Sequence, residues 1–446
     1  MSARSNITKR FSEMDGHMRE VLTGASLAFV LRIFGAAAAF ALNVLIGRLL
    51  GAEGAGLYFL ALSVALIASI LAQLGLANTL LRFISAGAAN NDWGQIKGVF
   101  SQGIKYASVA SVGLAILMAA TASWSAEYIF DKPALTAPLR YMSLAVISFS
   151  LMTLLAESLK GLKQIGRSML VTGVIYPLVA LVLIWPLATV GGVTGASLAY
   201  VIGTLVAALA GAYWWHRTVR DHGPARPLAS AELWQSARPL LVMNLIVRGV
   251  IPMAPLFLVG IWSSAEDAGI LGAATRLALL ASFFLAAVNT AIAPKFSELY
   301  TKGDMVSLAR VTRRFALGIT LATSPLFLVL FFAGDWVMSL FGPDFTRGGS
   351  TLAILAVGQL VNSMFGAAVF LLMMSGNEKD VRTASLIAAA VLTLLLLTLV
   401  PSYGLIGAAI SASAAYAALT LWSAFMVGKR LGVQPFSLVI WKSPKQ

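Results

Sequence analysis

The chain has 446 residues, of which 59% are hydrophobic and 11% are charged, and its mean hydropathy is +0.85. Because soluble domains carry about 25% charged residues, this composition excludes a soluble protein and indicates an all-α integral membrane protein. The chain contains no cysteine, which excludes disulfides, iron–sulfur clusters and thiolate zinc sites. Its three histidines, His17, His216 and His222, lie in polar segments. We therefore expect no metal site and no cofactor.

The chain begins with a polar segment, 1–20, which carries four basic residues but no apolar stretch typical of a signal peptide. Twelve apolar stretches follow, and each is long enough to cross a bilayer as a helix. In the first half, 21–215, they cover 21–46, 55–81, 99–122, 137–159, 168–187 and 194–215. In the second half, 238–427, they cover 238–262, 269–293, 315–333, 350–374, 383–400 and 405–427. A polar cytoplasmic linker, 216–237, is predicted to join the halves, and a cytoplasmic tail, 428–446, is predicted to follow.

Two glycine-rich segments indicate that the two halves are copies of one unit. When Gly47 is aligned with Gly260, the turn AEGAG at 52–56 falls on AEDAG at 265–269. Six helices per half leave both copies in the same orientation relative to the membrane. We therefore predict two six-helix bundles that are related by a pseudo-two-fold axis along the membrane normal and enclose a central cavity.

Lysine and arginine are distributed unevenly between the two sides of the predicted helices. The side that holds both termini and the linker carries 24 of the 32, the other side carries four, and the remaining four lie within spans. Because lysine and arginine are enriched in cytoplasmic loops, we predict that both termini are cytoplasmic. The same bias explains the net charge of +14 without a nucleic-acid partner. The basic loops are expected to rest on anionic headgroups of the lipid bilayer.

The arginines within the spans are the strongest candidates for function. Arg32 and Arg248 lie near the midpoints of the first and seventh predicted spans, whereas no acidic residue lies in the core of any span. An arginine at this depth costs at least about 2.5–3.5 kcal/mol. Either backbone carbonyls satisfy these cations, or they face a water-filled cavity and bind an anion, and we favour the cavity. Arg276, about two turns into the eighth span, lines the same cavity or reaches the headgroups; Lys105 is expected to snorkel.

Amide side chains within the spans carry a weaker signal. They are expected to form hydrogen bonds between helices or to contact sugar hydroxyls. These amides are Asn43, Gln73, Asn78, Asn244, Asn289, Gln359 and Asn362.

Two prolines, Pro252 and Pro255, lie near the centre of the seventh predicted span. Each removes a backbone hydrogen-bond donor and tends to kink its helix. Such residues are also common in membrane helices generally. The sequence therefore supports a hinge and a purely structural kink equally.

The segment RLLGAEGAGLY, from Arg48 to Tyr58, and the twelve-span layout resemble the polysaccharide-exporter and O-antigen flippase branch of the multidrug/oligosaccharidyl-lipid/polysaccharide (MOP) exporter superfamily. The resemblance implies a transporter of the bacterial inner membrane, not an enzyme. It implies that an undecaprenyl-diphosphate-linked oligosaccharide moves from the cytoplasmic to the periplasmic leaflet by alternating access, for export of O-antigen, capsule or exopolysaccharide. It further implies that Arg32, Arg248 and Arg276 bind the diphosphate. Other polysaccharide-assembly proteins are expected partners.

Three alternative functions are open at this point. A lipid II flippase belongs to the same superfamily, although the opening turn is more similar to the polysaccharide branch. A multidrug exporter is expected to place a carboxylate in its cavity, and the cores of the spans contain none. A membrane glycan polymerase or ligase is expected to have a large outer loop with catalytic groups, whereas the predicted outer loops are short.

Overall fold

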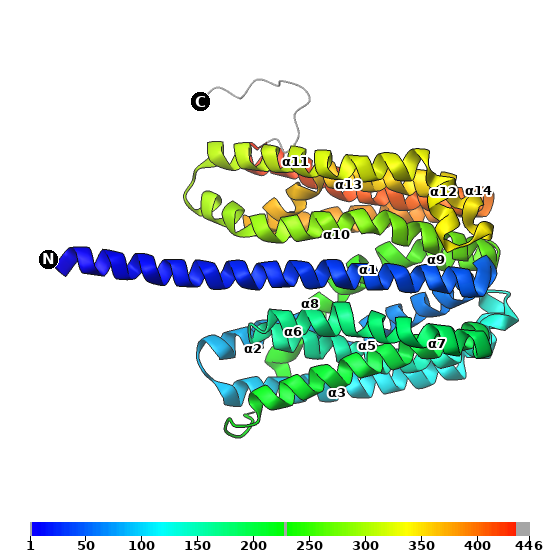
Figure 1. Cartoon of the computed structure of the whole chain (residues 1–446), viewed down its shortest axis with the longest axis horizontal. Coiled ribbons are helices and arrows are strands. Elements are labelled where there is room, and N and C mark those ends of the chain that lie inside the picture. The colour runs from blue at the N-terminus through cyan, green and yellow to red at the C-terminus, as the bar shows by residue number, and fades with distance from the viewer. Residues whose placement is uncertain (1, 227–229, 434–446) are drawn as a thin grey trace.

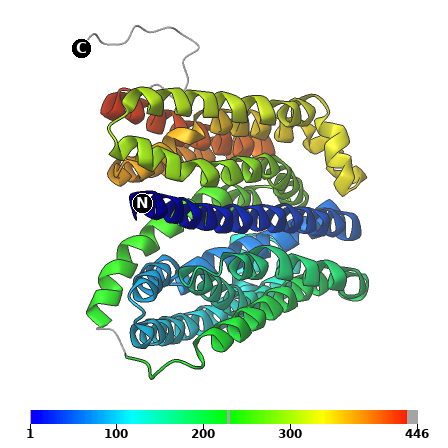
Figure 2. The same ribbon diagram turned by 60° about the vertical axis from the view of Figure 1, so that its left-hand side comes forward.

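The computed structural model describes the backbone of residues 2–226 and 230–433, and their side chains except at 2–29, 230, 281–295, 297–298 and 378. Every regular element in the described ranges is a helix. Figures 1 and 2 show two stacks of helices, with the long first part of α1 (Ser2–Ala72) running between them.

The first half continues with α2 (Leu76–Ala89), α3 (Trp93–Ala120), α4 (Ala122–Trp124), η1 (Ser125–Ile129), η2 (Pro133–Leu135), α5 (Thr136–Gly161), α6 (Ile165–Met169), η3 (Leu170–Ile175) and α7 (Tyr176–Val219). The second half comprises α8 (Ser230–Asn244), η4 (Leu245–Val250), α9 (Ile251–Trp262), α10 (Ala265–Thr301), α11 (Met305–Phe332), α12 (Gly334–Met338), η5 (Ser339–Phe341), η6 (Pro343–Gly348), α13 (Gly349–Met374) and α14 (Glu378–Leu431). The boundaries predicted for the two halves stay a prediction.

The helices account for all twelve predicted spans. Among the described residues, eight helical segments are long and apolar enough to cross a membrane. Three of them are interrupted by a glycine with positive φ, at Gly51, Gly192 and Gly404, and so contain two spans each. The incompletely described α10 supplies the remaining span. The predicted all-α class with twelve membrane helices is therefore confirmed.

Two of these glycine turns repeat one another in detail. Gly192 has φ 54° and ψ −131°, and Gly404 has φ 49° and ψ −121°, a conformation that only glycine adopts without strain. Three residues later, a Cβ on Gly195 would lie 1.8 Å from the Leu187 carbonyl oxygen, and a Cβ on Gly407 would lie 2.4 Å from that of Leu399. The matching contacts support a duplicated unit.

The second predicted span, 55–81, differs from the structure. The helix ends at Ala72 and resumes at Leu76, because Leu74 and Gly75 have positive φ of 52° and 76°. A Cβ on Gly75 would lie 2.1 Å from the carbonyl oxygen of Ala237 in α8. The first helix of the second half therefore packs directly against this break. The apolar pattern continues across the break, and therefore did not reveal it.

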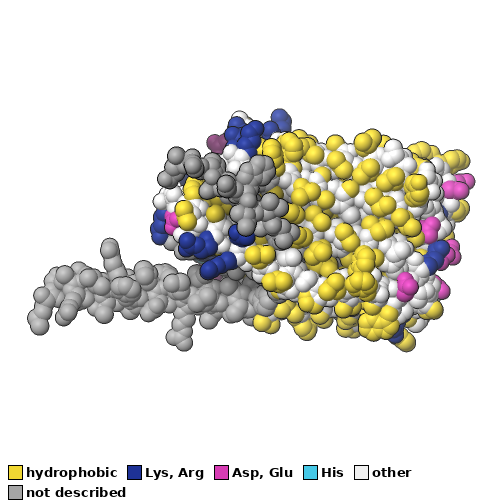
Figure 3. Space-filling view, turned by 90° about the horizontal axis from the view of Figure 1, so that it is seen from above, with side chains coloured by type: hydrophobic (Ala, Val, Ile, Leu, Met, Phe, Trp, Pro, Cys, Tyr) yellow, Lys and Arg dark blue, Asp and Glu magenta, His cyan; other side chains and the backbone are white. Residues whose placement is uncertain are grey.

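The two ends of the helix stacks carry different charges (Figure 3). Blue lysine and arginine side chains gather at the end from which α1 starts, which we name the basic end. The opposite end, named the glycine-turn end after Gly51, Gly192 and Gly404, shows acidic side chains. Exposed aromatic side chains near the glycine-turn end, Trp124, Tyr128, Trp336 and Tyr403, have the placement of a membrane-interface belt.

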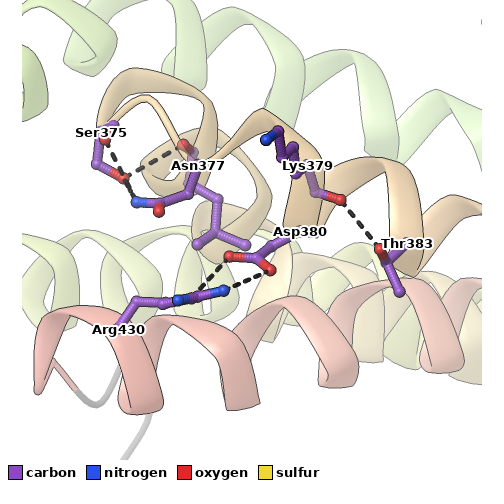
Figure 4. Close-up of polar contacts among 7 residues, drawn as sticks. Ser375, Asn377, Lys379, Asp380, Thr383 and Arg430 are labelled. Atoms are coloured by element: carbon purple, nitrogen blue, oxygen red, sulfur yellow. Dashed lines mark hydrogen bonds and ion pairs between the residues drawn. The ribbon is translucent and has the colours of Figure 1, made fainter.

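Polar contacts tie elements together at the basic end. Figure 4 shows Arg430, at the end of α14, donating to both carboxylate oxygens of Asp380 near its start, at 3.2 and 3.5 Å. In the first half, the ring of His222 stacks on Trp93 with centroids 3.5 Å apart, and Arg226 pairs with Asp92. The described part of the linker is thus fixed to the first half.

Candidate functional site

A cavity of about 230 Å³ lies between the two halves, near the middle of the helices. The second part of α1 forms one wall, from Phe59 to Leu66, and α9, α10, α13 and α14 form the other. Its polar lining side chains are Ser63, Thr275, Arg276, Gln359 and Tyr416. No acidic side chain is among the lining residues, all of which the structure describes. The cavity therefore carries one cation and no compensating carboxylate.

Arg276 is held by groups from both halves. Its guanidinium carbon lies 3.7 Å from the ring centroid of Phe59, and its Nη1 donates to the carbonyl oxygen of Gly272 at 2.9 Å. Three tyrosines of the first half, Tyr58, Tyr176 and Tyr200, lie close to it. A π face and a carbonyl oxygen thus stabilise the cation in place of an ion pair.

The glycine-turn end of the cavity is closed where the duplicated segments 52–56 and 265–269 meet. The sequence predicted turns here, but both segments are helical: 52–56 follows the kink at Gly51, and 265–269 begins α10. A Cβ on Gly56 would lie 1.7 Å from the Ala265 carbonyl oxygen, and a Cβ on Gly269 would lie 2.0 Å from that of Ala52. The sequence alignment pairs these four residues in the same order. The contact is therefore reciprocal, as expected for a pseudo-two-fold axis that passes between the two segments.

Two basic residues strengthen this closure. Lys132 of the first half donates to the carbonyl oxygens of Gly260 and Ser263 at the end of α9, at 2.7 and 2.9 Å. Burial lowers the pKa of Lys132, while Asp131 and Asp267 oppose that shift. Arg48 likewise donates from Nε to the Leu340 carbonyl oxygen at 2.8 Å. Both cations bind backbone acceptors of the other half.

The other predicted arginines lie outside the cavity lining. Arg248 is exposed in the π turn η4, one turn before the cavity residues Ile251 and Pro252 on the same helix. Arg32 is partly exposed in α1 and lies nineteen residues before Gly51, about 28 Å along the helix axis. That depth is closer to the basic end than the predicted midpoint. Neither arginine has an ion-pair partner within the described residues.

The predicted prolines and amides divide into two groups. Pro252, Pro255 and Gln359 line the cavity, and Asn362 donates to Gln359 Oε1 at 3.1 Å. The other described amides do not line it: Asn43 donates to the Ala39 carbonyl of its own helix at 2.6 Å, Gln73 and Asn244 are buried, and Asn78 is half-buried. The side chain of Asn289 lies outside the described residues.

Sequence reasoning missed the aromatic half of the site. Phe59 and Tyr58 directly follow the segment 52–56, but an aromatic residue in an apolar helix has the same pattern as ordinary core packing. Tyr176 and Tyr200 are distant in sequence, and only the packing of η3 and α7 on α1 brings them near Arg276. The one available signal was that a buried cation without carboxylates needs other electron-rich neighbours.

Comparisons with known proteins identify the family and the fold of the chain. Residues 21–300 match the family of polysaccharide biosynthesis proteins. A probable low-salt glycan biosynthesis flippase of Haloferax volcanii, Agl15, is 24% identical over 190 residues, which cover 41% of this chain and 39% of that relative. The chain thus spans well under half the length of this curated relative.

Solved structures share the fold. The lipid II flippase MurJ in an inward closed conformation superposes with a TM-score of 0.71 at 16% identity, covering 90% of this chain and 87% of that one. An inward-facing multidrug resistance transporter of the MATE family superposes with a TM-score of 0.68 at 17% identity. The superposition covers 92% of this chain and 99% of that one. A MOP superfamily transporter from Pyrococcus furiosus, described as having reversed binding-pocket polarity, superposes with a TM-score of 0.64 at 17% identity. The superposition covers 93% of this chain and 96% of that one. The chain has the MOP fold and, because the family match spans more than half its length, belongs to the polysaccharide biosynthesis protein family.

Proposed function

We propose that this protein flips an undecaprenyl-diphosphate-linked oligosaccharide from the cytoplasmic to the periplasmic leaflet of the bacterial inner membrane by alternating access. Membership of the polysaccharide biosynthesis family and the flippase and transporter relatives already indicate a lipid-linked glycan flippase or MOP transporter rather than an enzyme. The observation that carries the finer proposal is Arg276, a cation in a carboxylate-free cavity between the halves. Arginine's planar fork suits a diphosphate, and the prenyl chain can stay in lipid.

The positions of Arg248 and Arg32 support a path for the diphosphate from the basic end. The glycine-turn end is closed by the contacts of Gly56 and Gly269, so an anion reaches the cavity from the opposite side. Arg248 is exposed and lies one helical turn closer to the basic end than the cavity residues Ile251 and Pro252. Arg32 lies closer still to the basic end. In the proposed cycle, these two arginines guide the diphosphate toward Arg276, and opening at the glycine-turn end releases it.

Purified protein in liposomes is expected to move a lipid-diphosphate oligosaccharide between leaflets without changing its length. Leaflet position is read by enzymatic oxidation of a terminal sugar from outside, and length by mass spectrometry. Gly113→Ala is the matched control, because a Cβ at Gly113 meets no atom within 4 Å and transport should persist. Elongation or transfer of the glycan would instead support the polymerase or ligase, and movement of cationic drugs in place of the lipid would support the multidrug exporter.

The proposed orientation is supported by the charge at the two ends. Because the basic end is expected to be cytoplasmic, Gly223→Cys in the described part of the linker should resist an impermeant thiol reagent added to intact cells. Ser123→Cys, exposed near the glycine-turn end, should react. The natural chain has no cysteine, so each variant reports one position. Labelling of Gly223→Cys but not Ser123→Cys would reverse the proposed direction.

A further inference from the structure

We propose that Phe59 is a positioning residue for the diphosphate-binding arginine, so that the anion site is complete only while the glycine-turn end is closed. The inference rests on the proposed function. It concerns how affinity for the cargo is linked to the conformation of the two halves, and it assigns that link to one aromatic side chain.

The first step is the geometry of Arg276. Its guanidinium carbon lies 3.7 Å from the ring centroid of Phe59, so the flat ion lies against the ring face, while Nη1 donates to Gly272. Stacking occupies the flat face of a guanidinium. Its N–H donors lie in the plane of the ion and point outward from its edge, so they can still bind other groups. Within the described residues, Nε and Nη2 have no hydrogen-bond acceptor. The stack therefore fixes the plane of the ion while leaving two donors for an anion.

The second step is that the two partners belong to different halves. Arg276 and Gly272 are on α10, whereas Phe59 and the neighbouring Tyr58 are on the second part of α1. A Cβ on Gly272 would lie 2.4 Å from the Phe59 ring, so the ring is seated directly on α10. If the halves separate here, Arg276 loses the surface that orients it.

The third step is that the contact between Phe59 and Arg276 lies close to the contact between Gly56 and Ala265. Phe59 lies three residues, less than one helical turn, after Gly56, whose backbone contacts Ala265. Opening the contact between Gly56 and Ala265 must draw Phe59 away from α10. By thermodynamic linkage, an anion that prefers the ordered arginine then favours the closed arrangement, and opening lowers anion affinity. Cargo is thereby bound on one side and released on the other without a titrating carboxylate.

The test uses farnesyl diphosphate as the probe, with farnesol as the uncharged control, on purified protein in nanodiscs. Affinity is measured by calorimetry. The conformation is measured by pulsed electron paramagnetic resonance between spin labels at Ser123→Cys in the first half and Thr346→Cys in η6. Both positions are exposed near the glycine-turn end.

We expect Phe59→Leu to bind farnesyl diphosphate roughly tenfold more weakly than the unchanged protein, because the cation–π contact is lost in a desolvated site. The diphosphate should shift the unchanged protein toward the short inter-label distance, and Phe59→Leu should lose this shift. Phe59→Tyr, which keeps the ring, should retain both properties. Gly56 does not line the cavity, yet Gly56→Ala should also weaken binding, because it disfavours the closed arrangement.

Phe257→Leu is the matched control. Phe257 of α9 meets Phe130 of the first half edge to face, with ring centroids 5.1 Å apart, so the variant removes an aromatic contact between halves that involves no cation. Its diphosphate affinity and its distance shift should stay within about twofold of the unchanged protein. Phe59→Leu with unaltered affinity and an unaltered shift would refute the positioning role alone. Failure of the unchanged protein to bind farnesyl diphosphate would instead overturn the proposed function.

Discussion

Gly56→Ala is expected to reduce transport by more than about tenfold, because the methyl group prevents the glycine-turn end from closing. The added Cβ would lie 1.7 Å from the Ala265 carbonyl oxygen and 2.7 Å from its carbonyl carbon. Both atoms belong to the backbone, so no side-chain rotation relieves the clash. The equivalent change at Gly269 meets the Ala52 carbonyl oxygen at 2.0 Å and should have the same effect.

The transport assay and the spin-label distance between positions 123 and 346 together check this expectation. In Gly56→Ala, the long-distance population should dominate while the helical content stays unchanged. Gly113→Ala makes the same chemical change within α3, where a Cβ meets nothing within 4 Å. It should leave transport and distances unaltered and stabilise the helix by about 0.5–1 kcal/mol. Full transport by Gly56→Ala would show that the tight contact between segments 52–56 and 265–269 is not a gate.

Much of the architecture was predictable from sequence, because membrane helices need long apolar stretches and duplicated turns need repeated glycines. The alignment of 52–56 with 265–269 placed together four residues that the structure brings into reciprocal contact. The alignment could not show that the two segments pack against each other. Close packing of two backbones requires only small residues, and small residues have many other roles in a membrane helix. The repeated segment was predictable as a motif, whereas its helical structure and its role in closing this end required the structure.

The candidate site was less predictable than the fold. An apolar run shows where a helix crosses the bilayer but not where it ends, so Arg32 was placed at a midpoint, whereas α1 extends well beyond that span. The break at Leu74 is invisible for the same reason, because leucine at positive φ is dictated by tertiary packing. Phe59 was unremarkable in an apolar helix until its neighbour across the halves was known.

Loss of the arginines is expected to have the largest effect on transport. Arg276→Ala and Arg248→Ala should each lower transport by at least about tenfold, because each removes a charge-assisted hydrogen bond to the diphosphate. Arg248→Lys should keep part of the activity, since the charge survives. Arg276→Lys should keep less transport activity than Arg248→Lys. A guanidinium can stack its flat face on Phe59 while the N–H donors at its edge bind the anion, whereas an ammonium has no flat face.

The depth of the three arginines sets the order of these effects. Measured along the helices from Gly51 and from its aligned position Ser264, Arg276 lies about 18 Å away, Arg248 about 24 Å and Arg32 about 28 Å. Since desolvation increases toward the middle of the membrane, Arg32→Ala should reduce transport least of the three. Lys105→Met is the control, because Lys105 is exposed on α3 and has no bonding partner within the described residues. Normal transport by Arg248→Ala/Arg276→Ala would contradict diphosphate binding by these arginines. A loss that matched the loss of folded protein, measured by size-exclusion chromatography, would mean that Phe59 and Gly272 hold Arg276 for stability alone.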